Sequence, residues 1–320
     1  MGIRVLKTAI AATVAVYLAY WLQLDSYLTA GILAILGVDV TKKRGLTSSS
    51  VRILASILGL VASSLIFALL GFQIWVLAVF IMIVYPILVK AKLHDGIITS
   101  SVVVVHLFAA QTVAFANVLN EIELLLVGLG TATLINLLYM PKVERRLLET
   151  REKLEQLFAQ IFKEIGLHLR NHDTHVWDGQ ELLRVGETLR EGISLSRQSA
   201  ENALFQRNEY WENYFEMRRQ QLDYVQRMLD LVAQVYQTLP HGQATAEVFD
   251  ELSVEVRTEY YTGQVEALHV ALQAEFKQMS LPNTREEFEV RSTILQLFIE
   301  LKNYLDVAKK LKKKNVENKI

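Results

Sequence analysis

The chain has 320 residues and a formal net charge of −1, and it contains no cysteine. The absence of cysteine excludes disulfides, a thiol nucleophile and a thiolate metal site. The near-neutral charge hides two unlike parts, because residues 1–140 carry eight Lys/Arg against five Asp/Glu, whereas residues 141–320 carry 25 against 29. The first part is mostly Ala, Val, Ile and Leu. We therefore interpret the chain as a membrane domain followed by a water-soluble domain.

Six apolar runs in the first part have the character of membrane-spanning helices. A hydrocarbon core of ~30 Å needs about 20 helical residues at ~1.5 Å each. The predicted spans are residues 5–24, 27–40, 51–70, 73–89, 97–116 and 122–140. The second run is short for a span. Near its end the first run has the bulky Ala19-Tyr20-Trp21 rather than a small-x-small cleavage site, so we expect it to be retained as an anchor.

The basic segment 37–52 fixes the predicted orientation. It carries Lys42, Lys43, Arg44 and Arg52, and short Lys/Arg-rich loops stay on the cytoplasmic side. If all six runs cross, every basic loop of the first part falls on that side. If the second run did not cross, basic loops would alternate between sides. We therefore expect six spans with both ends in the cytoplasm, and small residues such as Gly59 and Gly128 where spans pack closely.

The second part, residues 141–320, shows helical periodicity and no strand-like alternation. Amphipathic helices are predicted over 142–169, 182–200, 211–239, 244–279 and 284–314, with a loop at 172–179 and a stop at Pro240-His241-Gly242. The predicted fold class is therefore all-α. It comprises a transmembrane domain over 1–140 and a cytoplasmic helical domain over 141–320.

Motifs of enzymatic chemistry are missing from the sequence. It contains no phosphate-binding loop, zinc-protease His-Glu-x-x-His, nucleophile elbow or dinucleotide fingerprint. We predict that the protein is not an enzyme and needs no cofactor. His168, His172 and His175 with Asp173 suggest a metal cluster, but histidine also complements a helix end, and we expect no metal site. The lysines between 309 and 314 either bind anionic headgroups or form a solvated helix end.

Four polar residues in the first part are candidates for a transport pathway. His106 is predicted to lie mid-span, with Gln111 five residues on, and ionisable groups at that depth usually face a cavity or pathway. The alternative is a histidine bonded to a neighbouring helix. Arg52 and Asp39 bracket the basic loop, where they pair, or Arg52 faces an anion entrance or snorkels to headgroups. We expect no carboxylate at the depth of His106, and hence a neutral imidazole at rest.

Two stretches resemble the aromatic acid exporter family of bacterial membrane proteins. One runs from Ala34 to Gly59, with a short second span, a Thr/Ser-rich loop, and then an Arg and a Gly entering the third span. The other is the aromatic-rich stretch from Tyr210 to Gln221. The plant aluminium-activated malate channels share this layout and work as dimers. The resemblance implies export or conduction of anions by a homo-oligomer.

These observations predict an integral transporter or channel of the bacterial cell membrane that exports small organic anions, such as aromatic carboxylic acids. The expected partners are the lipid bilayer, a second copy of the chain and the anion, with no nucleic acid. The alternative is a membrane-anchored scaffold or sensor that acts through its cytoplasmic helices, whose periodic faces suit partner helices.

Overall fold

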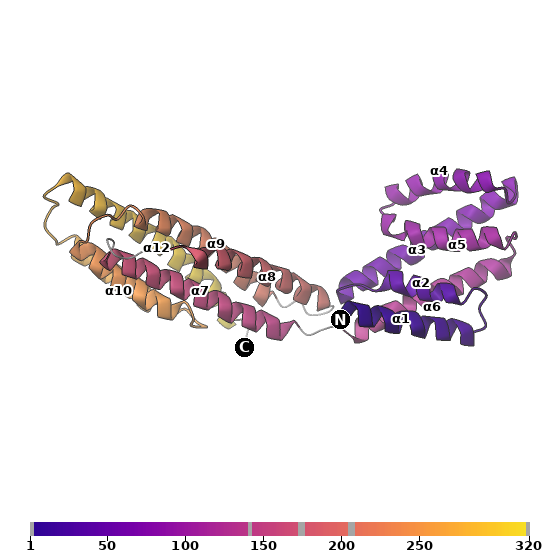
Figure 1. The fold of residues 1–320 in the computed structure, drawn as a ribbon, viewed down its shortest axis with the longest axis horizontal. Helices are drawn as coiled ribbons and strands as arrows, with labels where there is room; N and C mark the ends of the chain where they lie inside the picture. The colour runs from indigo at the N-terminus through magenta and orange to yellow at the C-terminus, as the bar shows by residue number, and fades with distance from the viewer. Residues whose placement is uncertain (1–2, 140–142, 172–176, 204–208, 318–320) are drawn as a thin grey trace. The chain divides into compact units, whose positions relative to one another are not determined.

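The computed structural model describes residues 3–139, 143–171, 177–203 and 209–317, with side chains up to Lys312. These residues form twelve α-helices and one short 3-10 helix, and no strand occurs among them, so the all-α prediction is confirmed. The helices gather in two compact units (Figure 1). One unit holds residues 1–142 with the short segment Glu201–Gln206, and the other holds 143–200 and 207–320.

The first unit consists of six α-helices with a 3-10 turn between the fourth and fifth, in the part of the chain that the structure describes. They are α1 (Ile3–Trp21), α2 (Leu28–Gly37), α3 (Lys42–Leu70), α4 (Ile74–Lys90), η1 (His94–Gly96), α5 (Ile97–Ala109) and α6 (Phe115–Leu138). By length and composition, α3 and α6 can each cross a membrane, whereas α2, α4 and the segment His94–Ala109 are apolar but shorter.

Small residues bring the helices of the first unit close together. The short helix α2 packs against α1 and α6, and α3 packs against α5, α6 and α4 (Figure 1). A Cβ atom at Gly128 on α6 would lie 2.6 Å from Leu33 Cβ and 2.8 Å from the Ala30 carbonyl oxygen of α2. At Gly37 it would lie 2.8 Å from Ala132 Cβ. The expectation of close packing at Gly128 is confirmed.

The basic segment is more helical than predicted. The expected loop over 37–52 is wrong from Lys42 onward, because α3 begins there and continues unbroken through Arg52. Thr41 has extended backbone angles, and its hydroxyl accepts a hydrogen bond from the backbone N–H of Arg44 at 3.3 Å. This cap satisfies one of the free donors at the helix start. Hydropathy identifies only the apolar part of such a helix, so its polar first turns were predicted as a loop.

The second unit is a bundle of six α-helices among the described residues. They are α7 (Glu144–Arg170), α8 (Gln180–Asn202), α9 (Tyr210–Val232), α10 (Pro240–Glu255), α11 (Gln264–Phe276) and α12 (Arg285–Glu317). Two predictions are wrong. Pro240 opens α10 rather than stopping the preceding helix, since proline suits the first helical turn. The single helix over 244–279 is broken before Gly263, which adopts a left-handed φ of 78°.

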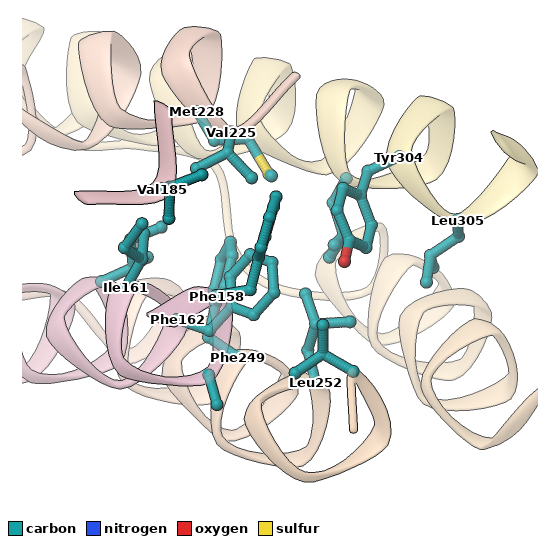
Figure 2. Packing of buried hydrophobic residues seen from close by; sticks show 14 of the residues in the cluster. Phe158, Ile161, Phe162, Val185, Val225, Met228, Phe249, Leu252, Tyr304 and Leu305 are labelled. Atoms are coloured by element: carbon teal, nitrogen blue, oxygen red, sulfur yellow. The ribbon is translucent and has the colours of Figure 1, made fainter. Parts of the chain in front are cut away.

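Aromatic side chains form the centre of the second unit (Figure 2). Phe158 and Phe162 of α7 meet Phe249 of α10 and Tyr304 of α12, and all four are buried. The Phe162 ring centroid lies 6.2 Å from that of Phe249 and 5.4 Å from that of Tyr304, the latter in an edge-to-face arrangement. Such pairs add to the burial of large apolar surfaces. This core fixes α7, α10 and α12 to one another.

Candidate functional site

A cluster of polar side chains lies inside the otherwise apolar first unit. His106 comes from the last turn of α5, Glu121 from the second turn of α6 and Thr29 from the first turn of α2. His106 Nδ1 lies 3.3 Å from Glu121 Oε2, and His106 Nε2 lies 3.2 Å from Thr29 Oγ1. The Glu121 side chain is 7% exposed and that of His106 is 26% exposed. Both ring nitrogens therefore face a hydrogen-bonding partner.

The turn between α5 and α6 creates this contact. Helix α5 ends at Ala109, and Gln111 takes a left-handed φ of 54° that reverses the chain. Helix α6 then begins at Phe115, seven residues before the apolar run that was predicted as a span. Because these extra residues are helical, Glu121 lies on α6 beside the end of α5. His106 thus lies in the last turn of α5 rather than at the middle of a helix over 97–116, and its depth in a membrane stays a prediction.

The expectation that no carboxylate reaches His106 is wrong. It rested on placing Glu121 at the membrane edge before the sixth span, and on extending the fifth span to residue 116. In the structure α5 is shorter and α6 longer, so both residues lie at the same level. Sequence reasoning missed Glu121 and Thr29, because neither belongs to a motif and the contact depends on how three helices pack.

A pocket of about 200 Å³ opens beside this cluster. Its lining is Asp25, Ser26, His106, Leu107, Ala109, Ala110, Asn117, Asn120 and Glu121. The Asn120 side chain accepts a hydrogen bond from the Asp25 backbone N–H at 2.9 Å and donates one to the Asp25 carbonyl at 3.3 Å. This pair of bonds holds the turn after α1 against α6 and shapes the pocket.

The chemistry of the cluster suits a proton. An ionised carboxylate accepts hydrogen bonds and does not donate them, so Glu121 favours a proton on His106 Nδ1. The Thr29 hydroxyl either donates to Nε2 or accepts from it, which accommodates the neutral and the charged imidazole alike. Two carboxylates, Asp25 and Glu121, line the pocket and would repel an organic anion. The site can therefore exchange protons or hold a cation.

The other predicted pathway residues lie apart from this cluster. Gln111 is exposed in the α5–α6 turn, where its side-chain amide donates to the Phe108 carbonyl at 3.4 Å. Asp39 pairs with Arg44 at 3.5 Å rather than with Arg52. The Asp39 carbonyl also accepts a bond from Lys7 at 3.2 Å. Asp39 is therefore part of the contacts that tie α1 to the start of α3.

Arg52 lies on α3, where its Nε donates to Ser48 Oγ at 3.2 Å. This bond links two residues one turn apart on the same helix. The predicted role of Arg52 at an anion entrance stays a prediction.

A second polar centre is buried in the bundle of the second unit. Arg218 is 1% exposed and donates to Glu155 at 3.2 Å, to Tyr214 at 3.1 Å and to the Val256 carbonyl at 2.8 Å. Burial raises the pKa of Tyr214, which also donates to Glu155 at 3.0 Å. The aromatic-rich stretch 210–221 thus contributes a buried, hydrogen-bonded arginine. Such networks link the helices that supply their partners.

The lysine-rich end of α12 is only partly free to meet a membrane surface. Lys309 bonds Glu266 at 2.9 Å, and Lys312 is buried, with its ammonium donating to the Thr258 carbonyl at 2.8 Å. Headgroup binding by this cluster stays a prediction. Of the suggested metal cluster, His172, Asp173 and His175 lie outside the described residues.

Comparisons with known proteins cover both units. The family model "Aromatic acid exporter family member 1" matches residues 1–140, and "Putative aromatic acid exporter C-terminal domain" matches residues 144–309. The "Uncharacterized protein YqjA" of Bacillus subtilis (strain 168) is 33% identical over 305 residues, which is 95% of this chain and 94% of that protein. The "UPF0421 protein YgaE" of the same strain is 28% identical over 178 residues, 55% of this chain and 49% of that protein.

A solved structure, titled "Crystal structure of putative membrane protein from Clostridium difficile 630", is 20% identical at a TM-score of 0.46. The similarity covers 54% of this chain and 99% of that one.

Proposed function

The chain belongs to the aromatic acid exporter family, and from that premise we propose that it exports small organic anions, aromatic carboxylic acids in particular, across the bacterial cell membrane. The family is one of exporters rather than of enzymes, and its models match both parts of the chain. The observation that carries the proposal beyond the family is the His106–Glu121 pair. A unit that served only as an anchor would not need a buried ionisable pair beside a polar pocket.

The proposed transporter has six membrane-spanning segments, α1 to α6, and exposed apolar side chains support this number. The proposed cytoplasmic position of both ends rests on the basic residues at the start of α3. Large apolar residues on this unit face outward, among them Leu69, Ile74, Met82 and Leu138, each at least 76% exposed. In water this surface would be unfavourable, whereas lipid accepts it. The ten residues of α2 cover only about 15 Å of a ~30 Å core. Its close packing on α1 and α6 shields it where it is too short.

The His106–Glu121 pair and the basic residues at the start of α3 have complementary roles in the proposed export. The pocket at His106 carries negative charge and exchanges protons. The lysines and arginines at the start of α3 attract the anion on the cytoplasmic side. Proton movement at one site and anion movement at another would couple export to the proton gradient.

Efflux from cells tests the proposal directly. Cells with and without the protein are loaded with radiolabelled 4-hydroxybenzoate, and its loss is followed at external pH 6 and pH 8. We expect faster efflux with the protein, a rate that depends on pH, and a rate without that dependence in His106→Gln. Glu121→Gln should also alter the pH dependence of efflux, since it removes the carboxylate that faces His106 Nδ1 while leaving the imidazole in place. Gln73→Ala, an exposed change before α4 at a side chain that makes no cap hydrogen bond, is the control and should resemble the wild type.

The proposal fails if the protein changes the efflux of no acid across a panel of aromatic and dicarboxylic acids. Membrane abundance is measured for every variant. An unchanged pH profile in His106→Gln at normal abundance would assign that residue to packing.

A homodimer is the proposed assembly, and a stripe on α12 supports it. Phe288, Leu295 and Ile299 are 58%, 54% and 45% exposed. Their spacings of seven and four residues put them on one face of the helix. A second copy of the chain would cover this apolar stripe. The detergent-corrected mass under mild extraction should equal two chains of 36.4 kDa, and Phe288→Ser with Leu295→Ser should reduce it. Leu281→Ser, exposed but off the stripe, is the control.

The same stripe is what a scaffold or sensor would offer to another protein. Cross-linking in cells distinguishes a homodimer from a scaffold, because a scaffold would give a cross-linked product with a different protein. Recovery of the protein itself alone would count against the scaffold.

A further inference from the structure

Helices α3 and α5 approach each other closely on the side of the first unit that carries Arg52. A Cβ atom at Gly59 would lie 1.9 Å from Ser100 Oγ. At Gly96 it would lie 2.3 Å from Ala55 Cβ and 3.1 Å from Arg52 Cα. The backbones therefore meet along residues 52–59 of α3 and 96–100 of η1 and α5. We call the polar groups of this contact, Arg52, Ser56 and Ser100, the serine seam.

Two hydroxyl groups in the seam are buried without a hydrogen bond. Ser56 and Ser100 are both 0% exposed, and neither Oγ has a partner among the described residues. Other hydroxyls on the same helices divide into two groups, because those of Ser49 and Ser64 on α3 are also buried without a partner. Ser63 and Thr99 each donate to the backbone carbonyl three residues earlier, at 3.1 Å and 2.9 Å. Such local bonds are the usual solution for a helical Ser or Thr. Ser56 and Ser100 lack them and lie in the segments where α3 and α5 meet.

The guanidinium group of Arg52, whose Nε donates to Ser48 one turn nearer the start of α3, adds an unpaired donor on that helix. Its Nη1 atom is buried and has no partner in the part of the chain that the structure describes. Arg52 and Ser56 are four residues apart and share one face of α3. Arginine stays protonated in proteins, so this nitrogen carries part of a full positive charge. Buried donors without acceptors are costly, and a ligand that supplies acceptors would satisfy them.

We propose that the serine seam binds the carboxylate group of the exported anion when α3 and α5 separate, and that the structure shows the seam closed. This inference rests on the proposed export of organic anions and names the site that recognises them. A carboxylate offers two oxygens that accept several hydrogen bonds, and a guanidinium group can donate to both at once. The two hydroxyls then donate to the remaining lone pairs.

The surroundings of the seam favour a carboxylate on an apolar body. A Cβ at Gly59 would lie 3.8 Å from a Val104 methyl carbon, and Leu60 beside it is fully buried. Once the helices part, these groups would contact an aromatic ring attached to the carboxylate. The seam presents a single positive charge, which suits a monocarboxylate better than a more highly charged anion.

Binding of benzoate to the full-length protein in detergent micelles tests the seam, with neutral benzamide as the comparison ligand. We expect Ser56→Ala and Ser100→Ala each to weaken benzoate binding by about fivefold, and Arg52→Gln by at least about tenfold, as for hydrogen bonds to a charged group. Benzamide should bind weakly to every form. The melting temperature should not fall in the two alanine variants, because each removes an orphan hydroxyl. Ser63→Ala is the matched control, and its benzoate affinity should equal that of the wild type.

A labelling experiment checks the opening of the seam without relying on affinity. The natural chain has no cysteine, so Ser56→Cys introduces a single thiol. We expect a small thiol reagent to label it slowly, and benzoate but not benzamide to change the rate. The wild type could bind and export benzoate while all three seam variants keep the same affinity for it. That result would overturn the proposal that the seam binds the carboxylate, but not the proposed function. Absence of benzoate binding in the wild type would overturn the seam, and the proposed function would fall with it only if no acid of the panel were exported.

Discussion

Lys312 should make the stability of the second unit depend on pH. Its side chain is buried near Arg218, and its ammonium group reaches the Thr258 carbonyl. Burial, and then the positive charge of Arg218, lower its pKa from 10.5 to about 7, although Glu155 and Glu255 oppose the shift. The change we consider is Lys312→Met, which keeps a long apolar side chain and removes the titrating group.

Whether stability rises or falls with pH depends on which state, folded or unfolded, binds more protons. The unfolded chain keeps the proton on Lys312 up to about pH 10, whereas the folded chain releases it near pH 7. Between these values the unfolded state binds more protons, so raising the pH stabilises the fold by roughly 1 kcal/mol per pH unit. Below pH 7 both states are protonated and the cost of burying the charge is fully present. Lys312→Met should therefore be more stable than the wild type at pH 7, by roughly 2 to 4 kcal/mol after the lost hydrogen bond is counted.

Denaturant unfolding of the full-length protein in detergent, followed by circular dichroism from pH 6.5 to pH 9.5, measures this effect. The wild type should gain stability with rising pH, and the gain should largely disappear in Lys312→Met. Lys310→Met, at an exposed position two residues earlier, should keep the wild-type slope. Equal slopes for the wild type and Lys312→Met, or a less stable Lys312→Met at pH 7, would refute the reasoning.

Three further changes test the packing, each measured by thermal or denaturant unfolding. Gly128→Ala should destabilise the first unit by about 1 to 3 kcal/mol, because its Cβ would meet α2 backbone, whereas Gly130→Ala, with open space around it, should be neutral or stabilising. Arg218→Met should cost the second unit about 2 kcal/mol or more, since it removes one of the two arginines that pair with buried Glu155 and the donor to the Val256 carbonyl; an unchanged midpoint would contradict this. Phe162→Ala should cost about 3 to 5 kcal/mol by opening a cavity in the aromatic core, and a loss below 1 kcal/mol would show that the core collapses around it.

The apolar runs located the helices of the first unit, but hydropathy could not locate their ends. Hydrophobic runs show where a helix is buried or faces lipid, and polar residues can continue the helix unseen. The first turns of α3 carry lysine and arginine, and those of α6 carry asparagine and glutamate. In the second unit the spacing of apolar residues predicted α7, α8 and α12 well, whereas α9 ends at Val232, before the predicted end at residue 239. Gly263 itself indicated a break in the predicted helix over 244–279. The helical spacing of the apolar residues around it led to the prediction of one continuous helix.

The sequence alone predicted one residue of the candidate site, His106, but not the residues it contacts. His106 stood out because a histidine within an apolar run is unusual. Its partners Glu121 and Thr29 could not be assigned, because each contact joins different helices and depends on the turn at Gln111. The unsatisfied hydroxyls of Ser56 and Ser100 were likewise invisible, since serine at a helix contact usually indicates packing alone.

The two apolar cores have a consequence for how the protein is made. The buried apolar cluster of the first unit ends at Ala132, and that of the second begins at Val143, so the clusters share no side chain. A ribosome adds about 5 to 20 residues per second, so the residues after Lys142 take roughly 9 to 36 s to synthesise. During that time the chain already contains every side chain of the first unit's buried apolar cluster, as far as the structure describes it. Translation that stops early in the second unit would leave a nascent product whose first core can still form.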